Sequence, residues 1–314
     1  MNKLMKVAVA STLVVTMLAG CSSTPAAKYA KVGLGVVSSF NEETNQVNTT
    51  MATVALDKDG KIAYIDLDVA QSTPTDEKKA LTETKEERGD AYGMKETSAK
   101  NGKIENGGEW FEQAAAFEEY CLGKTPAEVA GMELEDYHGG KAPATGTDLA
   151  SKCTITVDAF LAAIDKAVAN AKEVEADKVG VGEVMSNNAD KAQVDTTIAV
   201  VATDADGKVV YTKLDVAQIY KGVTETKGER KEAYGMKETS AKNGKIENGG
   251  EWYEQAAAFE AFTVGKTLEE VAAVEVEDYH GGKAPATGTD LASKCTITID
   301  AFLEAIAEAG ANLK

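Results

Sequence analysis

Asp148-Leu149-Ala150-Ser151-Lys152-Cys153-Thr154 is a heptapeptide that recurs unchanged as Asp290-Leu291-Ala292-Ser293-Lys294-Cys295-Thr296. Each copy is followed, two residues further on, by a second threonine and then by an apolar stretch with helical spacing. A polar heptapeptide that is kept intact at two places indicates that one structural unit is present twice. The repeated heptapeptide therefore predicts two similar domains.

Longer identical blocks extend the duplication over most of the chain. Residues 91–110 are identical to residues 233–252, and residues 135–156 are identical to residues 277–298. The segments that precede these blocks are related but have diverged more. This pattern indicates either that both copies need the same site or that the duplication is recent.

The length of the repeat sets the domain organisation. A unit of this size matches a compact domain rather than a solenoid repeat. We expect tandem domains over 29–172 and 173–314, with an insertion in the first copy at a loop within 72–81. The join, residues 167–178, is charged and rich in alanine. We expect it to extend the last helix of the first domain.

Alternating character predicts a pair of antiparallel strands near the start of each copy, joined by a turn that contains Asp-x-Asp-Gly. The expected strands are Val47–Leu56 and Lys61–Asp68, and in the second copy Val194–Thr203 and Lys208–Leu214. Gly33 and Gly35 precede the first pair, but the third glycine and the helix of a dinucleotide-binding fingerprint do not follow them. We therefore expect no dinucleotide site there.

Helices are predicted in the second part of each copy. Residues 82–106 read as loop or mixed structure, and 109–122 has helical apolar spacing that ends at Gly123. Thr125 and Glu128 form a capping-box pattern with a proline at the first helical position. The last helix is expected over 157–169, with one apolar face made of Phe160, Leu161, Ile164 and Val168. The fold class is α+β: two tandem domains, each with a small antiparallel sheet and packed helices.

The first twenty residues have the pattern of a bacterial lipoprotein signal peptide. Lys3 and Lys6 precede an apolar segment over 7–18, which is too short for a confident membrane span. The segment ends in Leu-Ala-Gly-Cys21, and this lipobox predicts acylation of Cys21 and cleavage before it. Acyl chains would then anchor the protein to the membrane, with 21–28 as a tether. An ordinary secretory signal with a chance cysteine is the alternative.

Charge and cysteine content limit which partners and which kinds of site are expected. The net charge of −18 repels phosphate backbones, so nucleic-acid binding is not expected. Cys121 has no counterpart in the second copy, whereas Cys153 and Cys295 are equivalent residues of separate domains. With no Cys-x-x-Cys motif, neither a disulfide framework nor a metal site is expected. We expect Cys153 and Cys295 to be small buried packing residues, with redox thiols as the alternative.

The repeated motif has the composition of an anion site at the start of a helix. Thr154 lies just before the expected helix, whose free N–H groups and partial positive charge stabilise a phosphate. Lys152 adds a cation, and we expect Asp148 and Ser151 to bond the turn and fix the threonine hydroxyl. Ordinary helix capping explains the same residue types, and the spacing alone leaves both possibilities open.

The motif resembles the flavin attachment site of the FMN-binding domain family. The attachment motif of that family is acid-x-x-Ser/Thr-Gly-Ala-Thr. A flavin transferase esterifies the phosphate of FMN to the last threonine of the motif. The matching residues are Asp148, Ser151, Thr154, Thr156 and Ala159, and in the second copy Asp290, Ser293, Thr296, Thr298 and Ala301.

The departures from the family pattern are lysines in place of glycine, Lys152 and Lys294, and cysteines in place of alanine. Lysine would be costly if that position required a positive φ.

The resemblance implies a function. Thr154 and Thr296 would each carry FMN through a phosphoester bond, and the chain would be an electron carrier rather than an enzyme with its own substrate. The implied donors are a membrane NADH dehydrogenase or quinol pool, and the implied acceptors are extracellular, such as ferric iron. The location would be the outer face of the cell membrane, reached by the lipid anchor alone.

Several other side chains are candidates for contact with a flavin. His138 and His280 are the only histidines, one in each copy, and either a role at the flavin ring or a structural role in a loop fits them. Trp110 and Trp252, with Tyr92 and Tyr234, are candidates to stack on the ring or to pack in the core.

Two functions of other classes stay open. A cofactor-free lipoprotein that binds a solute or peptide would use the glycine-rich loops as its site, and it would be colourless. A surface structural module or adhesin would suit the acidic charge, but it predicts more copies or a wall-anchoring tail, and neither is present in the sequence. The signal segment could also be released as a peptide pheromone.

Overall fold

The computed structural model describes residues 27–314. The expected signal peptide, Cys21 and residues 21–26 of the expected tether lie outside the described residues. Within the described part, no helix is long and apolar enough to cross a membrane. The described chain contains helices packed on antiparallel sheets, so the α+β class is confirmed.

The first half begins with three long strands and ends with a long helix and a short strand. Its elements are β1 (Tyr29–Asn41), β2 (Gln46–Leu56), β3 (Ile62–Ser72), α1 (Lys85–Arg88), η1 (Gly89–Tyr92), α2 (Lys95–Lys100), α3 (Trp110–Cys121), α4 (Pro126–Ala130), β4 (Leu134–Tyr137), β5 (Gly140–Pro143), η2 (Leu149–Ser151), α5 (Asp158–Asn170) and β6 (Lys172–Ala176).

The second half repeats this order without counterparts of η2 and β6. Its elements are β7 (Lys178–Asn188), β8 (Gln193–Thr203), β9 (Val209–Ile219), α6 (Lys227–Arg230), η3 (Lys231–Tyr234), α7 (Lys237–Lys242), α8 (Trp252–Thr263), α9 (Leu268–Ala272), β10 (Val276–Tyr279), β11 (Gly282–Pro285) and α10 (Asp300–Ala311).

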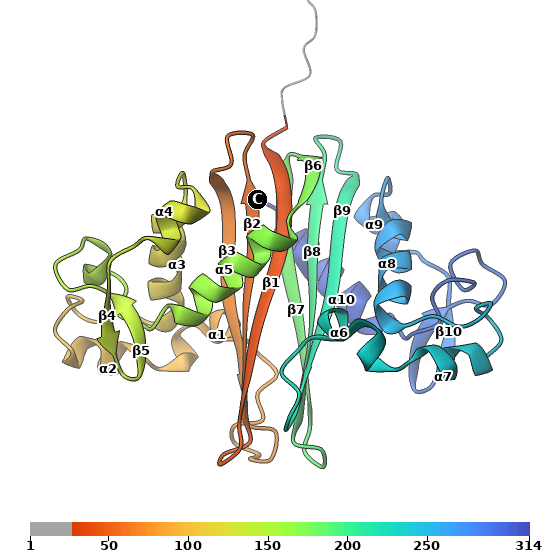
Figure 1. Cartoon of the computed structure of the whole chain (residues 1–314), viewed down its shortest axis with the longest axis horizontal. Helices are drawn as coiled ribbons and strands as arrows, with labels where there is room; N and C mark the ends of the chain where they lie inside the picture. Colours follow the sequence, from red (N-terminus) through yellow and green to blue (C-terminus); the bar gives the residue numbers. More distant parts are fainter. Residues whose placement is uncertain (1–26) are drawn as a thin grey trace, which may run out of the picture.

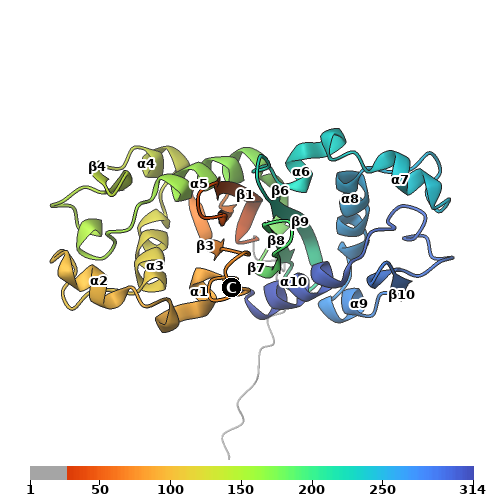
Figure 2. The same cartoon turned by 90° about the horizontal axis from the view of Figure 1, so that it is seen from below.

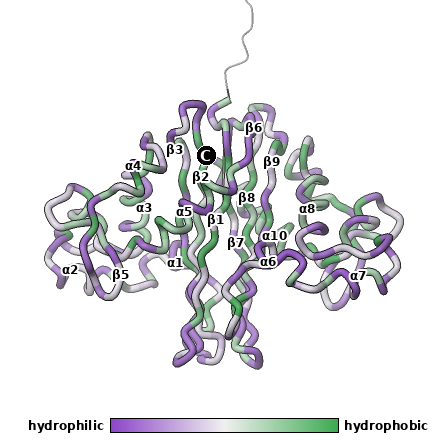
Figure 3. Tube along the Cα trace, in the orientation of Figure 1, coloured by the Kyte–Doolittle hydropathy of each residue, from purple (hydrophilic) through white to green (hydrophobic). Residues whose placement is uncertain are grey.

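The long strands, together with β6, form two antiparallel sheets that pack face to face in the centre of the molecule. One sheet has the order β3-β2-β1-β6 and the other has the order β7-β8-β9. Figure 1 shows the strands of the two halves standing side by side, with α2–α4 at one end and α7–α9 at the other. Apolar side chains of both sheets form one shared core, which includes Val32, Met51, Ile198 and Val200. Figure 3 shows that hydrophobic residues concentrate along these strands.

Each sheet also buries its outer face, because strand side chains alternate between the two faces. In the first half, Ala52 and Val54 of β2 join a second core with Phe117 of α3 and Phe160 of α5. A matching core in the second half contains Val201, Phe259 and Phe302. Figure 2 shows α5 and α10 on opposite sides of the strands. The molecule is therefore layered as helices, sheet, sheet and helices.

The expected strand pairs are confirmed, but the first strand of each sheet was not predicted. In β1, a Cβ atom at Gly33 would lie 2.0 Å from the carbonyl oxygen of Ala167, and one at Gly35 would lie 1.9 Å from that of Ala163. The two glycines thus let α5 cross β1 at backbone contact. Gly180 and Gly182 of β7 do the same for α10. Neither pair belongs to a nucleotide-binding turn.

The join between the halves is a strand, so the expected extension of the last helix is wrong. Helix α5 ends at Asn170, and β6 then pairs antiparallel with β1, with Lys31 opposite Glu173. Asp177 continues the pairing onto the other sheet, because its N–H donates to the carbonyl of Thr203 at 2.8 Å. The connection therefore ties the two sheets together at their edge.

The expected helix signals are confirmed in detail. Gly123 has φ 75°, as expected of a residue that ends α3. The Thr125 hydroxyl accepts the N–H of Glu128, whose carboxylate accepts the N–H of Thr125, and Pro126 opens the helix. Residues 82–106, expected as mixed structure, hold the short helices α1, η1 and α2. The hairpin β4–β5 was not predicted.

The inserted loop of the first half contacts the second half. Ser72 donates through Oγ to Oδ1 of Asn187 at 2.7 Å, and Nδ2 of Asn187 donates to the carbonyl of Leu81 at 2.8 Å. Both ends of the segment that contains the insertion therefore help to join the halves.

Candidate functional site

Each half contains a cavity between its sheet, its long helices and its hairpin. The cavity in the first half has a volume of about 380 Å³. It is lined by Asn48, Thr50, Val69, Lys85, Tyr92, Met94, Thr97, Ser98, Asn101, Trp110, Tyr137, His138, Thr154, Ile155, Thr156, Ala159 and Phe160.

The cavity in the second half occupies the equivalent place and has a volume of about 350 Å³. It is lined by Ser186, Asp195, Thr197, Val216, Gln218, Lys227, Tyr234, Met236, Trp252, Tyr279, Ile297, Thr298, Ala301 and Phe302. Both volumes fall in the range of small-molecule sites, which is about 300–1,000 Å³.

Thr154 is buried in the wall of the first cavity, and its hydroxyl is held by two amide side chains. The Thr154 hydroxyl donates to Oε1 of Gln113 at 3.0 Å, and the Thr154 N–H donates to the same oxygen at 2.8 Å. Asn101 donates from Nδ2 to the hydroxyl oxygen at 3.1 Å. Thr154 is only 3% exposed, so its hydroxyl has one fixed orientation.

Thr296 has the same surroundings in the second half. Its hydroxyl and its N–H donate to Oε1 of Gln255 at 3.0 and 2.8 Å, and Asn243 donates to the hydroxyl at 3.0 Å. Thr296 is 2% exposed, and the two residues that follow it, Ile297 and Thr298, line the second cavity. The geometry of the motif threonine is thus built twice.

The helix and loop before the cavity fix Gln113. Nε2 of Gln113 donates to the carbonyl of Gly108 at 2.9 Å, and this leaves Oε1 free to accept from Thr154. The loop that supplies Gly108 lies close against α2, because a Cβ at Gly107 would come within 2.2 Å of the Lys95 carbonyl. Ser98 adds a hydrogen bond from its hydroxyl to the carbonyl of Gly108 at 2.7 Å.

An aromatic wall with a lysine against it completes the first cavity. Nζ of Lys85 lies 5.1 Å from the ring centre of Tyr92 and 5.5 Å from that of Trp110. Burial lowers the pKa of Lys85 to about 8. Lys227 has the same position against Tyr234 and Trp252, at 5.4 and 5.8 Å. The four aromatic residues singled out in the sequence therefore all line the cavities.

The other polar residues of the motif lie at the surface. Asp148, Ser151 and Lys152 are exposed, and the Ser151 hydroxyl donates to the Asp148 carbonyl at 2.7 Å. The expectation that Asp148 and Ser151 fix the threonine hydroxyl is therefore wrong, because Gln113 and Asn101 perform that role.

The second copy agrees. Asp290, Ser293 and Lys294 are exposed, and Ser293 donates to the Asp290 carbonyl at 2.7 Å.

The lysine that departs from the family pattern is accommodated without strain. Lys152 has φ −125°, so its position does not require a glycine. Lys294 is not among the described residues with positive φ.

The two histidines sit in hairpin turns. His138 joins β4 to β5 with φ 47°, its ring packs edge-on against Tyr137 at 4.2 Å, and both residues line the first cavity. His280 has φ 48° and the same contact with Tyr279 at 4.3 Å, but of this pair only Tyr279 lines the second cavity.

The cysteines within the described residues are core side chains. Cys121, Cys153 and Cys295 are fully buried and unpaired. Burial raises the pKa of each thiol to about 12, which keeps it protonated and unreactive. Among residues 27–314, no group of three or more His, Cys, Asp and Glu side chains is arranged to hold a metal ion.

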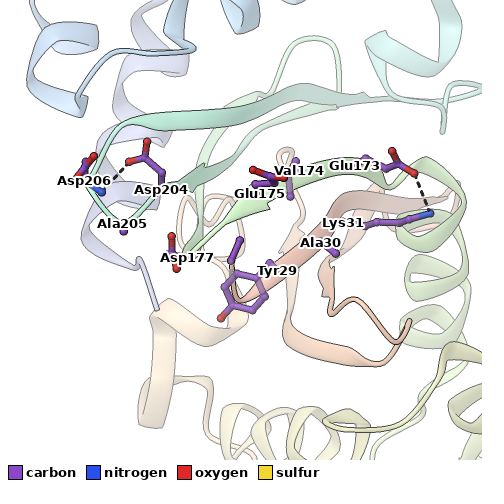
Figure 4. A pocket seen from close by; sticks show the side chains of 11 residues that line it. Tyr29, Ala30, Lys31, Glu173, Val174, Glu175, Asp177, Asp204, Ala205 and Asp206 are labelled. Atoms are coloured by element: carbon purple, nitrogen blue, oxygen red, sulfur yellow. Dashed lines mark hydrogen bonds and ion pairs between the residues drawn. The ribbon is translucent and has the colours of Figure 1, made fainter. Parts of the chain in front are cut away.

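A larger cavity, about 940 Å³, lies where the described chain begins. Figure 4 shows Tyr29 and Lys31 beside a group of acidic side chains, with Lys31 paired to Glu173. This cavity contains no residue of the repeated motif and lies at the join of the halves, so it occurs once. The duplicated cavities are the better candidate site.

Fold and site together define an α+β protein with two equivalent aromatic-lined cavities, each next to a buried motif threonine. The chain is similar to a protein described as chlorophenol reductase from Desulfitobacterium hafniense, with 35% identity over 130 residues. That match covers 33% of this chain and 38% of the relative, so it spans well under two thirds of the relative's length. No protein-family model matches the chain, and no solved structure matches it.

Proposed function

We propose that this chain is an electron carrier that holds FMN covalently, through phosphoester bonds to Thr154 and Thr296. The observation that carries the proposal is a cavity of ligand size, present twice, with the hydroxyl of the motif threonine fixed beside it by two amides. The two threonine hydroxyls do not cap the helices that follow, since the N-cap residues are Val157 for α5 and Ile299 for α10. The similarity to a reductase supports a redox role.

The residues present fit a flavin. Trp110 and Tyr92 offer flat apolar faces for a ring, and Lys85 brings a cation to the same wall. Asn101 supplies a donor at the threonine oxygen, where a phosphate would be attached. When bound, FMN supplies the redox chemistry, and the protein supplies attachment, orientation and electrostatics.

The cellular location in this proposal rests on the lipoprotein signal pattern of the first twenty residues. Acylation at Cys21 would hold the protein on the outer face of the cell membrane. Covalent attachment suits that location, because a dissociable cofactor would be lost by diffusion. A flavin transferase would load the sites, a membrane NADH dehydrogenase or quinol pool would supply electrons, and extracellular acceptors such as ferric iron would remove them.

The test is the intact mass of the mature protein after co-expression with a flavin transferase. We expect two FMN adducts in the wild type, one in Thr154→Ala, one in Thr296→Ala and none in the double variant. Thr156→Ala is the matched control, because Thr156 also lines the cavity but is the second threonine of the motif. A wild type without adducts, under conditions that modify an established carrier, would overturn the proposal.

A cofactor-free solute-binding lipoprotein is the second candidate. It is favoured by one observation, which is that both cavities combine aromatic with polar walls. This function predicts a colourless protein whose ligand binding does not depend on the Thr154 hydroxyl.

A further inference from the structure

The two cavities differ in residue type at one position. Every residue that lines either cavity has an identical counterpart in the other half, except Asn48, which is replaced by Asp195. Both residues lie two positions before a cavity-lining threonine, Thr50 or Thr197, on the second strand of their half, β2 or β8. The duplicated site is therefore a matched pair with one neutral amide exchanged for a carboxylate.

The side-chain oxygen of Asn48 accepts hydrogen bonds within the protein, which leaves the side-chain NH₂ group as a free donor. Its Oδ1 accepts from Nε2 of Gln46 at 3.1 Å and from Nε2 of Gln71 at 2.6 Å. These two bonds orient the side-chain amide, so that its NH₂ group is the part left to interact with a ligand.

Asp195 offers the opposite chemistry. Its Oδ2 accepts from Nε2 of Gln193 at 2.6 Å, whereas its Oδ1 is buried and has no hydrogen-bond partner. A buried acceptor without a protein partner is costly, so a donor group of a ligand bound in the second cavity would be stabilised there. The carboxylate also places a negative charge against the second cavity.

We propose that Asn48 and Asp195 give the two flavin sites unequal reduction potentials, and that the potential is higher at the site of the first half. Reduction by two electrons and one proton adds a negative charge to the flavin ring. The Asn48 amide stabilises that charge as a donor, and the Asp195 carboxylate opposes it. This inference rests on the proposed function.

The consequence is a preferred direction of electron transfer within the chain. Two electrons and one proton, supplied by the external donor, would leave the reduced flavin of the second half and reduce the oxidised flavin of the first. The site at Thr154 would thus be the point from which an acceptor takes electrons.

Single-site proteins allow each potential to be measured alone. Flavin-loaded Thr296→Ala reports the first site and Thr154→Ala reports the second, by spectroelectrochemical titration. We expect the first site to be favoured by tenfold or more in the two-electron equilibrium, which corresponds to about 30 mV or more. Asp195→Asn should raise the second potential to the level of the first, and Asn48→Asp should lower the first.

The controls separate this inference from the proposed function. Asp190→Asn removes one charge from the exposed turn of the same hairpin and should leave both potentials unchanged. Equal potentials in the two single-site proteins, or a difference that survives both exchanges, would overturn the inference while FMN adducts are present. Absence of any adduct would instead contradict the proposed function. Since each exchange introduces the residue that the other half already has, both variants should fold, and circular dichroism checks this.

Discussion

One amide side chain, Gln113, fixes the candidate attachment residue. Its two ends are both used, since Nε2 donates to Gly108 and Oε1 accepts twice from Thr154. A fully buried amide with all its partners present is worth far more than an exposed one, because each lost bond leaves a buried polar group unsatisfied.

We expect Gln113→Ala to lower the free energy of unfolding by about 2–4 kcal/mol and to reduce FMN attachment at Thr154. Urea unfolding and intact mass measure the two effects. Glu119→Ala, on the exposed face of the same helix, is the control and should change stability by less than about 0.5 kcal/mol. A Gln113 variant as stable as this control would show that the bond network contributes little.

The motif threonine could be predicted from the sequence, but its partners could not. Thr154 stands at a distinctive spacing from Asp148, whereas Gln113 and Asn101 reach it across 41 and 53 residues. The sequence signal for these two partners was weaker: both are polar residues in a segment that is identical or nearly identical between the copies. Gln113 also interrupts the apolar face of its helix between Trp110 and Phe117, and a polar residue there requires a buried partner.

At the scale of elements, the crossing of α5 over β1 depends on glycines. The helix lies against bare backbone at Gly33 and Gly35, and Nδ2 of Asn170 donates to the Leu34 carbonyl at 3.1 Å. This contact explains why β1 was not predicted, since glycines carry no side chain to continue the alternating pattern. The strand pairs that follow have that pattern and were predicted.

We expect Gly35→Ala to destabilise the protein by about 3 kcal/mol or more, because its Cβ would require the helix to move away from the strand. Gly60→Ala is the matched control. Its φ of 76° is strained for alanine, but no atom lies within 4 Å of the new Cβ, so a loss of about 1 kcal/mol is expected. Thermal unfolding compares them, and equal losses would contradict the role of the close crossing.

At the scale of the whole molecule, the contact between the halves carries buried acidic groups. Burial raises the pKa of Asp66 to about 6, that of Asp68 to about 7 and that of Glu118 to about 8. Glu183 of the other half lies nearby, and burial followed by the charge of Asp66 raises its pKa too. The second half has Lys213 at the position of Asp66, paired with Glu260 at 3.0 Å.

These raised pKa values predict stability that falls as the pH rises. The folded protein binds more protons than the unfolded chain between about pH 4 and pH 8, so the stability present at low pH is lost as the folded pKa values are passed. We expect the free energy of unfolding to drop by at least about 2 kcal/mol from about pH 5 to about pH 8.5.

Denaturant unfolding across this range makes the measurement. Asp66→Asn should flatten the dependence, whereas Asp59→Asn, in an exposed turn, should not. A stability that rises over this range would contradict the assignment.

The face-to-face packing of the two sheets also bears on how the chain can evolve. If each half were a separate chain that formed a homodimer, the two subunits would be identical. Any substitution would then appear on both sides of the interface and in both cavities. Joining the copies in one polypeptide removes that constraint. Equivalent positions can then carry different residues, as Asp66 and Lys213 do, and as Asn48 and Asp195 do, while each half keeps its fold. Fusion thus converts two interchangeable sites into a pair that can be ordered.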